Sequence, residues 1–335
     1  MYQKLQNVTL KSNESAELGV LSGPDTSDLA SRVRTLLGHK GPQWLWQIEE
    51  SLNVATPDVD SRFYIVIKDG RPVANIMTVT SMGIGIFGHV FTAPEERRKG
   101  AADIIQHHLM EDFVKRGGRA MYLGTGYDSH PYHLYAKYGF KGVQVGSGAM
   151  TWFAKGQEEF ERDVFRPSAT RHEVFSFKHW PTLPVIAMMK HPALLRIASM
   201  HVTTIRSSEG GSLDYLSPTS SVKDAGGVAW VAVSESSKIP VAVACMRCDE
   251  YLRDQTNVID LFCAPGFENE LPKLFEKLQM PPSRSAMCLA DPFWTGKRDI
   301  LKGLGFEKTG TMKASLRLYP SGASDVEIWM RPPQA

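Results

Sequence analysis

Few cysteines and the absence of a long apolar run narrow the class of protein. The four cysteines, Cys245, Cys248, Cys263 and Cys288, all lie in the second half of the 335 residues. So few thiols do not make a disulfide scaffold, and we expect them to stay reduced in a cytoplasmic protein. No stretch approaches the roughly 18 to 20 apolar residues of a membrane span. The start of the chain also lacks the apolar centre of a secretory signal, so we expect neither a membrane nor a secreted location.

The sequence also has no excess of charge of one sign. It carries 38 Lys and Arg against 36 Asp and Glu, a formal net charge of +2. This balance argues against nucleic acid as a partner, and it requires any anion site to be local. The pair Cys245-x-x-Cys248 is not followed by a second pair at ligand spacing, so no metal site is expected. Motifs of serine hydrolases and P-loop nucleotidases are missing as well.

What the first half does contain is an alternation of strand and helix patterns. Apolar residues on both sides of the polar turn at 68–71 predict a hairpin. Pro94 precedes a long amphipathic helix that stops at Gly117 and Gly118. The full prediction is strands at 16–23, 62–67, 72–82, 84–92 and 120–126, helices from the caps at 25–27 to 37 and at 43–53, 99–116 and 131–138, and a final strand pair near 141–153.

The second half repeats this order, which predicts two copies of one unit. The offset between matched residues changes only where loops intervene. We therefore predict a mixed α+β chain with two tandem domains, 1–155 and 156–335, joined by an irregular polar stretch near 154–170. The matches are 120, 121 and 123 with 286, 287 and 289 and 139–140 with 305–306 at an offset of 166 residues, 64–67 with 230–233 at the same offset, 72–74 with 240–242 at 168, and 93–94 with 264–265 at 171.

One run in the first copy predicts an anion site. At the point where a strand ends and a helix begins stand Arg97, Arg98, Lys99, Gly100, Ala101 and Ala102. A helix N-terminus leaves backbone N–H groups unpaired and carries partial positive charge, so a phosphate supplies the missing partners. Gly100 and Ala102 let the phosphate approach the backbone, and the basic side chains add charge-assisted bonds.

This run resembles a known cofactor loop. Arg-x-x-Gly-x-Ala after a strand is similar to the acetyl-CoA loop of the GCN5-related N-acetyltransferase (GNAT) family. Residues 128–140 resemble the second signature of that family, in which a tyrosine, here Tyr135, stands four residues before Gly-Phe. The two signatures cover about residues 15–153. Asp128 and Pro131 depart from the asparagine and alanine that the family commonly has there, which leaves contacts to the pantetheine arm at this point open.

The resemblance implies a splayed, mostly antiparallel sheet flanked by helices in each unit. The pantetheine of acetyl-CoA, the co-substrate, would insert where two strands part. The residues implied to bind it are Val90, Phe91, Thr92, Arg97, Arg98, Lys99, Gly100, Ala101, Ala102, Asp128 and Tyr132. Backbone N–H groups near Phe91 and Thr92 would polarise the thioester carbonyl.

Two catalytic roles remain to be filled. By resemblance Tyr135 is the proton donor to the departing thiolate, because a phenol stays protonated at neutral pH; the alternative is a tyrosine packed on its helix. Tyr132 and Tyr138 are lesser candidates. For the base that takes the amine proton we favour His89, with His130 and His133 as alternatives, each of which is otherwise a packed or solvated histidine. Trp44 and Trp46 line either the acceptor pocket or the core.

The second copy lacks the same residues. By the repeat offsets, Arg97 falls on Glu268, Gly100 on Leu271, and Tyr135 on Leu301. An acidic and crowded helix start does not bind phosphate, so we expect this copy to keep the fold without the cofactor site.

The function expected for the whole chain is transfer of an acetyl group from acetyl-CoA to a primary amine of a small molecule, by direct attack in a ternary complex. The chain would act as a monomer or a homodimer. Two alternatives stay open at this stage: use of another acyl-CoA or a carrier-bound acyl group, including decarboxylation, and a sensor that binds coenzyme A without turnover.

Overall fold

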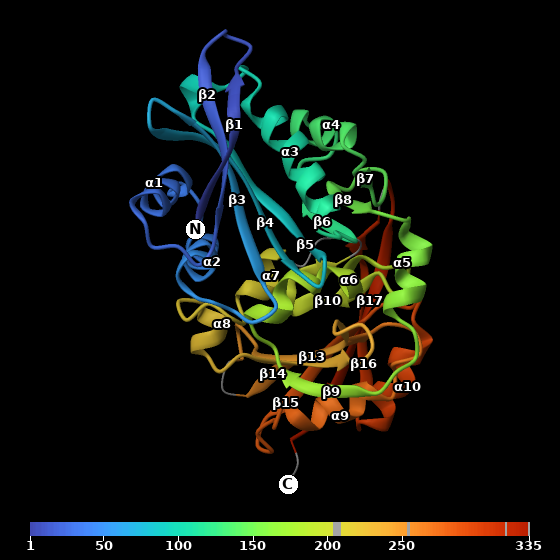
Figure 1. Cartoon of the computed structure of the whole chain (residues 1–335). Helices are drawn as coiled ribbons and strands as arrows, with labels where there is room; N and C mark the ends of the chain where they lie inside the picture. The colour runs from blue at the N-terminus through green and yellow to red at the C-terminus, as the bar shows by residue number, and fades with distance from the viewer. Residues whose placement is uncertain (204–208, 253–254, 319, 334–335) are drawn as a thin grey trace. The chain divides into compact units, whose positions relative to one another are not determined.

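The computed structural model describes residues 1–203, 209–252, 255–318 and 320–333. The chain divides into two compact units, residues 1–141 with 150–156 and residues 142–149 with 157–335 (Figure 1). No helix within the described ranges is long and apolar enough to cross a membrane. Each unit is built on its own sheet.

The first unit has a sheet of eight strands in the order β1, β2, β3, β4, β5, β6, β8, β7. Pairing from β1 through to β5 is antiparallel, whereas β5 and β6 are parallel. The bounds are Tyr2–Thr9 (β1), Ser15–Ser22 (β2), Asp60–Lys68 (β3), Arg71–Ser81 (β4), Ile84–Thr92 (β5), Ala120–Gly124 (β6), Lys141–Gly142 (β7) and Ala149–Phe153 (β8).

Helices cover both faces of this sheet. Figure 1 shows α1 and α2 on one side of β3 and β4, and α3 and α4 on the other. The apolar positions Ile105, Leu109 and Phe113 recur at helical spacing along α3 and join the buried core against the strands. The bounds are Asp28–Leu37 (α1), Pro42–Asn53 (α2), the 3-10 turn Pro94–Glu96 (η1), Ala101–Lys115 (α3) and His130–Lys137 (α4).

Two irregularities open the sheet beside α3. The strands β5 and β6 pair only where 84–86 meet 120–122, and they part beyond that point. On its other edge, β5 carries a one-residue bulge, because the register with β4 shifts between Asn75 and Met77. His89 lies in the bulge with a φ of +48°, a left-handed conformation that is uncommon for a non-glycine residue. The first unit is therefore splayed, as expected.

The second unit repeats the strand order of the first. Its seven strands follow as β9, β12, β13, β14, β15, β17, β16, which matches β2, β3, β4, β5, β6, β8, β7 one for one. The parallel pair recurs at β14 and β15. Two helices take the chain positions of α3 and α4. The bounds are Thr170–Val174 (β9), Val228–Ser234 (β12), Pro240–Cys248 (β13), Thr256–Cys263 (β14), Ser285–Ala290 (β15), Glu307–Arg317 (β16), Ala323–Arg331 (β17), Glu270–Lys277 (α9) and Thr295–Gly303 (α10).

A long connection distinguishes the second unit. Between β9 and β12 it has a series of short elements where the first unit has α1 and α2. These are Phe177–Thr182 (η2), Pro184–Met188 (α6), Leu195–Ile197 (β10), Ala198–Met200 (η3), Val202–Thr203 (β11), Glu209–Leu213 (α7) and Ser221–Asp224 (α8). The predicted fold class, two tandem units of mixed α and β structure, is confirmed.

At three places the structure differs from what the sequence suggested. The strand β1 at the start of the chain was not foreseen, because its outward residues are almost all polar and exposed. The stretch near 154–170 is not irregular, since Gln157–Val164 forms α5 with Phe160 and Val164 buried on one face. The helix that was predicted to begin at 99 begins at Ala101. Gly100, just before it, has a left-handed backbone with a φ of +86° and so cannot be part of the helix.

Candidate functional site

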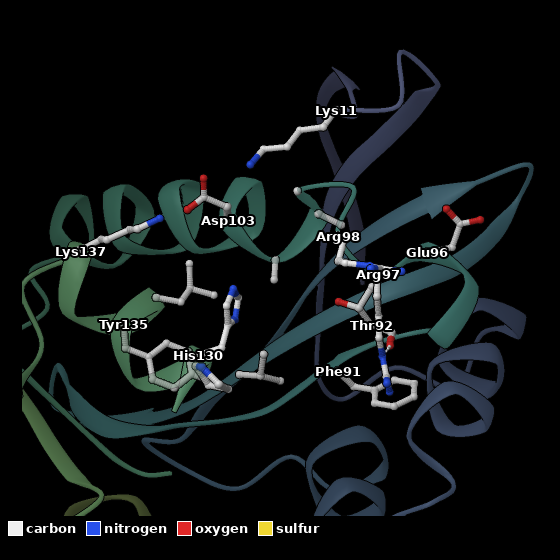
Figure 2. Close-up of a pocket in the computed structure, with 16 residues that line it drawn as sticks. Lys11, Phe91, Thr92, Glu96, Arg97, Arg98, Asp103, His130, Tyr135 and Lys137 are labelled. Atoms are coloured by element: carbon white, nitrogen blue, oxygen red, sulfur yellow. Dashed lines mark hydrogen bonds between the residues drawn. The ribbon is translucent and has the colours of Figure 1, made fainter. Parts of the chain in front are cut away.

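A cavity of about 610 Å³ opens at the N-terminus of α3. It brings together residues from β5, from the loop 97–102, from α3 and from α4. Figure 2 shows Tyr135 and His130 at one end of this space and Phe91 with Arg97 at the other. The lining is Lys11, Val90, Phe91, Thr92, Glu96, Arg97, Arg98, Gly100, Ala101, Ala102, Asp103, His130, Pro131, Leu134, Tyr135 and Lys137.

The backbone at the start of α3 is open to a ligand. Gly100 is the N-cap, and no side chain caps the helix. The first intrahelical bond runs from the Ile104 N–H to the Gly100 carbonyl, at 3.1 Å. The N–H groups of Ala101, Ala102 and Asp103 precede that bond and therefore lack a partner within the helix. The unpaired N–H groups of such a helix start can donate hydrogen bonds to a bound anion.

Basic side chains surround these amides. The Nε of Arg97 donates to the Thr92 carbonyl at 3.2 Å, and its guanidinium lies 5.9 Å from the centre of the Phe91 ring. Lys11 and Lys137 also line the cavity, and the Cγ of Lys11 lies 3.2 Å from where a Cβ on Gly100 would be. Neither lysine was foreseen. Lys11 comes from the turn after β1, the strand that sequence reasoning missed, and no local signal marks it.

Lys99 differs from its neighbours in the loop. Its Nζ lies 2.9 Å from Glu14 and 3.0 Å from Glu96, and the side chain does not line the cavity. Lys68 lies 3.0 Å from the same Glu96 carboxylate, which is 5% exposed. The Lys99 ammonium thus belongs to an ion-pair cluster that supports the loop.

The edge of β5 that faces the cavity lies beyond the last pair with β6. The Ala93 N–H donates to the Val73 carbonyl of β4 at 2.9 Å. Because N–H directions alternate along a strand, the neighbouring N–H of Thr92 points to the opposite edge, where β6 has parted from β5. Val90, two residues earlier, has the same direction. Both residues line the cavity, so their N–H groups face the space between the strands.

Tyr135 closes the other side of the cavity. It is 5% exposed, and its ring meets Phe87 edge-on at 5.0 Å between centroids. The short helix α4 positions it, with Ser129 as a cap whose side chain accepts from the Tyr132 N–H. Tyr132 packs its ring against Tyr127 at 5.5 Å and does not line the cavity. Tyr138 donates to the Asp103 carboxylate at 2.9 Å, and burial, together with this bond, raises the pKa of Tyr138 to about 12.

His89 lies outside the cavity lining, on the side of α2. Its Nε2 is 2.6 Å from the Gln47 Oε1, and Gln47 in turn donates to Ser51 at 2.8 Å. An amide oxygen only accepts, so Nε2 carries the hydrogen and Nδ1 is the acceptor. Burial, with a smaller contribution from the charge of Lys40, lowers the pKa of His89 to about 3. The ring is therefore neutral at physiological pH.

The other histidines and aromatic residues considered from the sequence lie at separate places. His130 lines the cavity, whereas the Nε2 of His133 lies 2.9 Å from the Asp128 carboxylate on the surface. Asp128 is exposed and left-handed, with a φ of +57°. Trp44 meets the ring of His89 edge-on at 5.4 Å between centroids. Trp46 is half-buried and is not among the lining residues.

The corresponding helix start in the second unit is built differently. The helix α9 begins at Glu270, which lies 2.6 Å from His172 and 2.9 Å from Lys273. Leu271, matched to Gly100 by offset, is fully buried in the first turn. Leu301, matched to Tyr135, is fully buried in α10. No phenol and no glycine stand at these places.

The long connection also bonds to β14 and to the end of β15. The N–H groups of Leu194 and Leu195 donate to Asp291, directly after β15, at 2.8 and 2.7 Å. The Ser199 N–H donates to Asp260 on β14 at 2.7 Å. The connection of the second unit is thus bonded both to β14 and to the residue that follows β15.

Comparison with known proteins adds a family assignment. Residues 30–140 match the model of the acetyltransferase (GNAT) family. A search of curated proteins found no match. Solved structures similar to the chain include the ribosomal-protein-S18-alanine N-acetyltransferase of Escherichia coli, at 10% identity and TM-score 0.36, over 50% of this chain and 96% of that one.

Two further similar structures come from other bacteria. One is a ribosomal-protein-alanine N-acetyltransferase of Brucella melitensis, at 16% identity and TM-score 0.36, over 48% of this chain and 99% of that one. The other is a phosphinothricin acetyltransferase of Sinorhizobium meliloti in complex with acetyl-CoA, at 18% identity and TM-score 0.31, over 39% and 72%. The match at 30–140 spans both signatures found in the sequence, and the chain therefore contains a GNAT acetyltransferase domain at residues 30–140.

Proposed function

We propose that the first unit transfers an acetyl group from acetyl-CoA to a primary amine of a small molecule, by direct attack in a ternary complex. The observation that carries the proposal is a single cavity that joins an uncapped helix start, an unpaired strand edge and a buried phenol. Each of these groups meets a different part of the reaction. None of them has a use in packing that requires all three to share one space.

The coenzyme A diphosphate fits the start of α3. The N–H groups of Ala101, Ala102 and Asp103 supply hydrogen bonds, and Arg97, Arg98 and Lys11 supply charge. We assign Lys99 to this site through its backbone, because its ammonium is held by two carboxylates. The small volume of Gly100 is needed here, because a Cβ would already press against Lys11.

The thioester fits the open edge of β5. In this placement the N–H groups of Val90 and Thr92 donate to the carbonyl oxygen and stabilise the negative charge that develops on it during attack. The amine nitrogen forms a bond to the acetyl carbon, and the bond from that carbon to sulfur breaks. Tyr135 gives its proton to the departing thiolate and regains one from solvent. The products are an acetylated amine and free coenzyme A.

The amine must lose a proton as well. With a pKa of about 3, His89 is a weak base and does not deprotonate a free ammonium group. We propose that its Nδ1 orients the amine or a water molecule, and that solvent takes the proton. His130, in the cavity itself, is the alternative acceptor.

Binding and turnover together test the proposal. The purified chain is titrated with acetyl-CoA by calorimetry, and is then incubated with acetyl-CoA and a panel of amino acids, polyamines, aminoglycosides and peptides. Mass spectrometry of the products is expected to show an added acetyl group on one class of amine. Binding without any acylated product would favour a sensor of coenzyme A, and absence of binding would overturn the proposal.

A further inference from the structure

Asn75 on β4 is bonded to the bulge that shapes the open edge of β5. Its Nδ2 donates to the His89 carbonyl at 2.9 Å. A left-handed residue turns its carbonyl away from the regular ladder, so this oxygen needs a partner from a side chain. Asn75 is 1% exposed, and the Oδ1 atom of the same amide has no hydrogen-bond partner in the described part of the chain.

This half-satisfied amide is unfavourable for stability. A buried acceptor without a partner costs free energy, whereas an apolar residue of similar size costs nothing of that kind. Its nearest neighbours in the strand are apolar, with Val73, Ala74 and Ile76 in the core. The asparagine is therefore explained by the hydrogen bond that its Nδ2 donates to the His89 carbonyl.

The second unit supplies an internal comparison. By the offset of the repeat, the counterpart of Asn75 is Val243, which pairs with Phe262 as Asn75 pairs with Phe91. The register between β13 and β14 runs without a shift from 242 to 248. The unit with asparagine has a bulge between the paired strands, and the unit with valine at the same position has none there.

The bulge decides which amides face the cavity. One extra residue in β5 shifts the alternation of N–H directions by one position relative to the strand before it. Without the bulge, the N–H of Thr92 would point toward β4 instead of toward the cavity. We propose that Asn75 is a positioning residue, which fixes the bulge at His89 and thereby directs the Val90 and Thr92 N–H groups to the acyl carbonyl. The effect of Asn75 on catalysis rests on the proposed function, whereas its effect on the bulge does not.

Three variants test this role. Asn75→Val introduces the residue of the second unit, and Asn75→Asp keeps the shape but loses the amide donor. Thr78→Val is the matched control, because Thr78 is a 1% exposed residue of the same strand whose hydroxyl has no partner in the described structure. Each variant is titrated with coenzyme A, and the carbonyl band of bound acetyl-CoA labelled with ¹³C is recorded by infrared spectroscopy.

Asn75→Val is expected to bind coenzyme A within about threefold of the original chain, since the start of α3 is unchanged. The labelled carbonyl band should return toward its frequency in free acetyl-CoA. For any amine that is found to be a substrate, kcat should fall by roughly 10- to 100-fold with little change in KM, a loss no larger than that of removing one oxyanion-hole donor. The melting temperature should be unchanged or higher. A residue that only supported the fold would lower the melting temperature and leave the band in place.

A readout in the free protein separates this inference from the proposed function. Amide hydrogen exchange at 89–92 is expected to change in Asn75→Val and Asn75→Asp but not in Thr78→Val. If the original chain fails to bind acetyl-CoA, the proposed function is lost, and the exchange data alone decide whether Asn75 fixes the bulge. Unchanged exchange and an unchanged carbonyl band in Asn75→Val would overturn the inference.

Discussion

The Nζ of Lys99 lies 3.0 Å from the Oε2 of Glu96, and this ion pair separates Lys99 from the arginines beside it. An ammonium that is already paired with a carboxylate has less of its charge available for a phosphate. Arg98, by contrast, lines the cavity. Adjacent basic residues of one motif thus have different tasks.

The two residues should respond differently to removal of charge. Arg98→Met is expected to weaken coenzyme A binding about 10- to 150-fold, because a charge-assisted hydrogen bond contributes roughly 1.5 to 3 kcal/mol. Lys99→Met should weaken it less than about threefold and should lower the melting temperature instead. Calorimetric titration with coenzyme A and thermal unfolding measure the two effects. Equal losses of affinity would show that the Lys99 ammonium reaches the ligand.

Gly100 should be sensitive to a single methyl group. Gly100→Ala adds a Cβ at 3.2 Å from Lys11 and strains a backbone with a φ of +86°. We expect coenzyme A binding to weaken at least tenfold. Gly117→Ala is the control at the other end of α3, with a φ of +80° and nothing within 4 Å of the added atom. Both changes should destabilise the fold by roughly 1 to 2 kcal/mol, and only the first should alter affinity.

Tyr135→Phe should affect the chemical step. If the phenol protonates the thiolate, kcat falls about 100-fold at neutral pH while KM for acetyl-CoA stays within about threefold. The difference should narrow at high pH, because a thiolate then needs no proton in order to remain the stable leaving group. Tyr138→Phe is the matched control, since its hydroxyl is bonded to Asp103. A pH-independent loss would argue against proton donation.

One acetyl-CoA should bind per chain. The second unit has a buried leucine, Leu271, in the first turn of α9, and its amides at 194 and 195 are bonded to Asp291 at the end of β15. Calorimetry is therefore expected to give a stoichiometry of about one, and Gly100→Glu should remove all binding. Residual binding in that variant would reveal a second site.

Acid should destabilise the first unit through His89. Its pKa is lowered from 6.5 to about 3, so the folded state takes up fewer protons than the unfolded state as pH falls between these values. The stability that the neutral ring contributes is complete above pH 6.5 and is lost as pH falls toward 3. Relative to His89→Gln, the original chain should lose about 2 kcal/mol between pH 7.5 and 4.5. Denaturant unfolding followed by tryptophan fluorescence tests this, and parallel pH profiles would contradict it.

Local patterns predicted much of the first unit from the sequence. The hairpin of β3 and β4, the strand β5 and the glycine before α3 are each encoded by alternation, turn residues or a helix stop within a few neighbouring positions. The linker was misjudged for the converse reason. Phe160 and Val164 form the apolar face of α5, but a helix of eight residues gives too short a periodic signal to be distinguished from an irregular polar stretch.

By itself, then, the sequence determined the mixed α+β class, the two copies and the loop 97–102, because each depends on residues that lie close together along the chain or recur at a fixed offset. Only the tertiary structure decided that Lys11 joins the loop, that Lys99 does not face the cavity, and that Asn75 holds the bulge at His89. These relationships connect residues up to about ninety positions apart, and no periodic pattern marks them. They arise from strand register and from the packing of α3 on the sheet, which are properties of the folded chain as a whole.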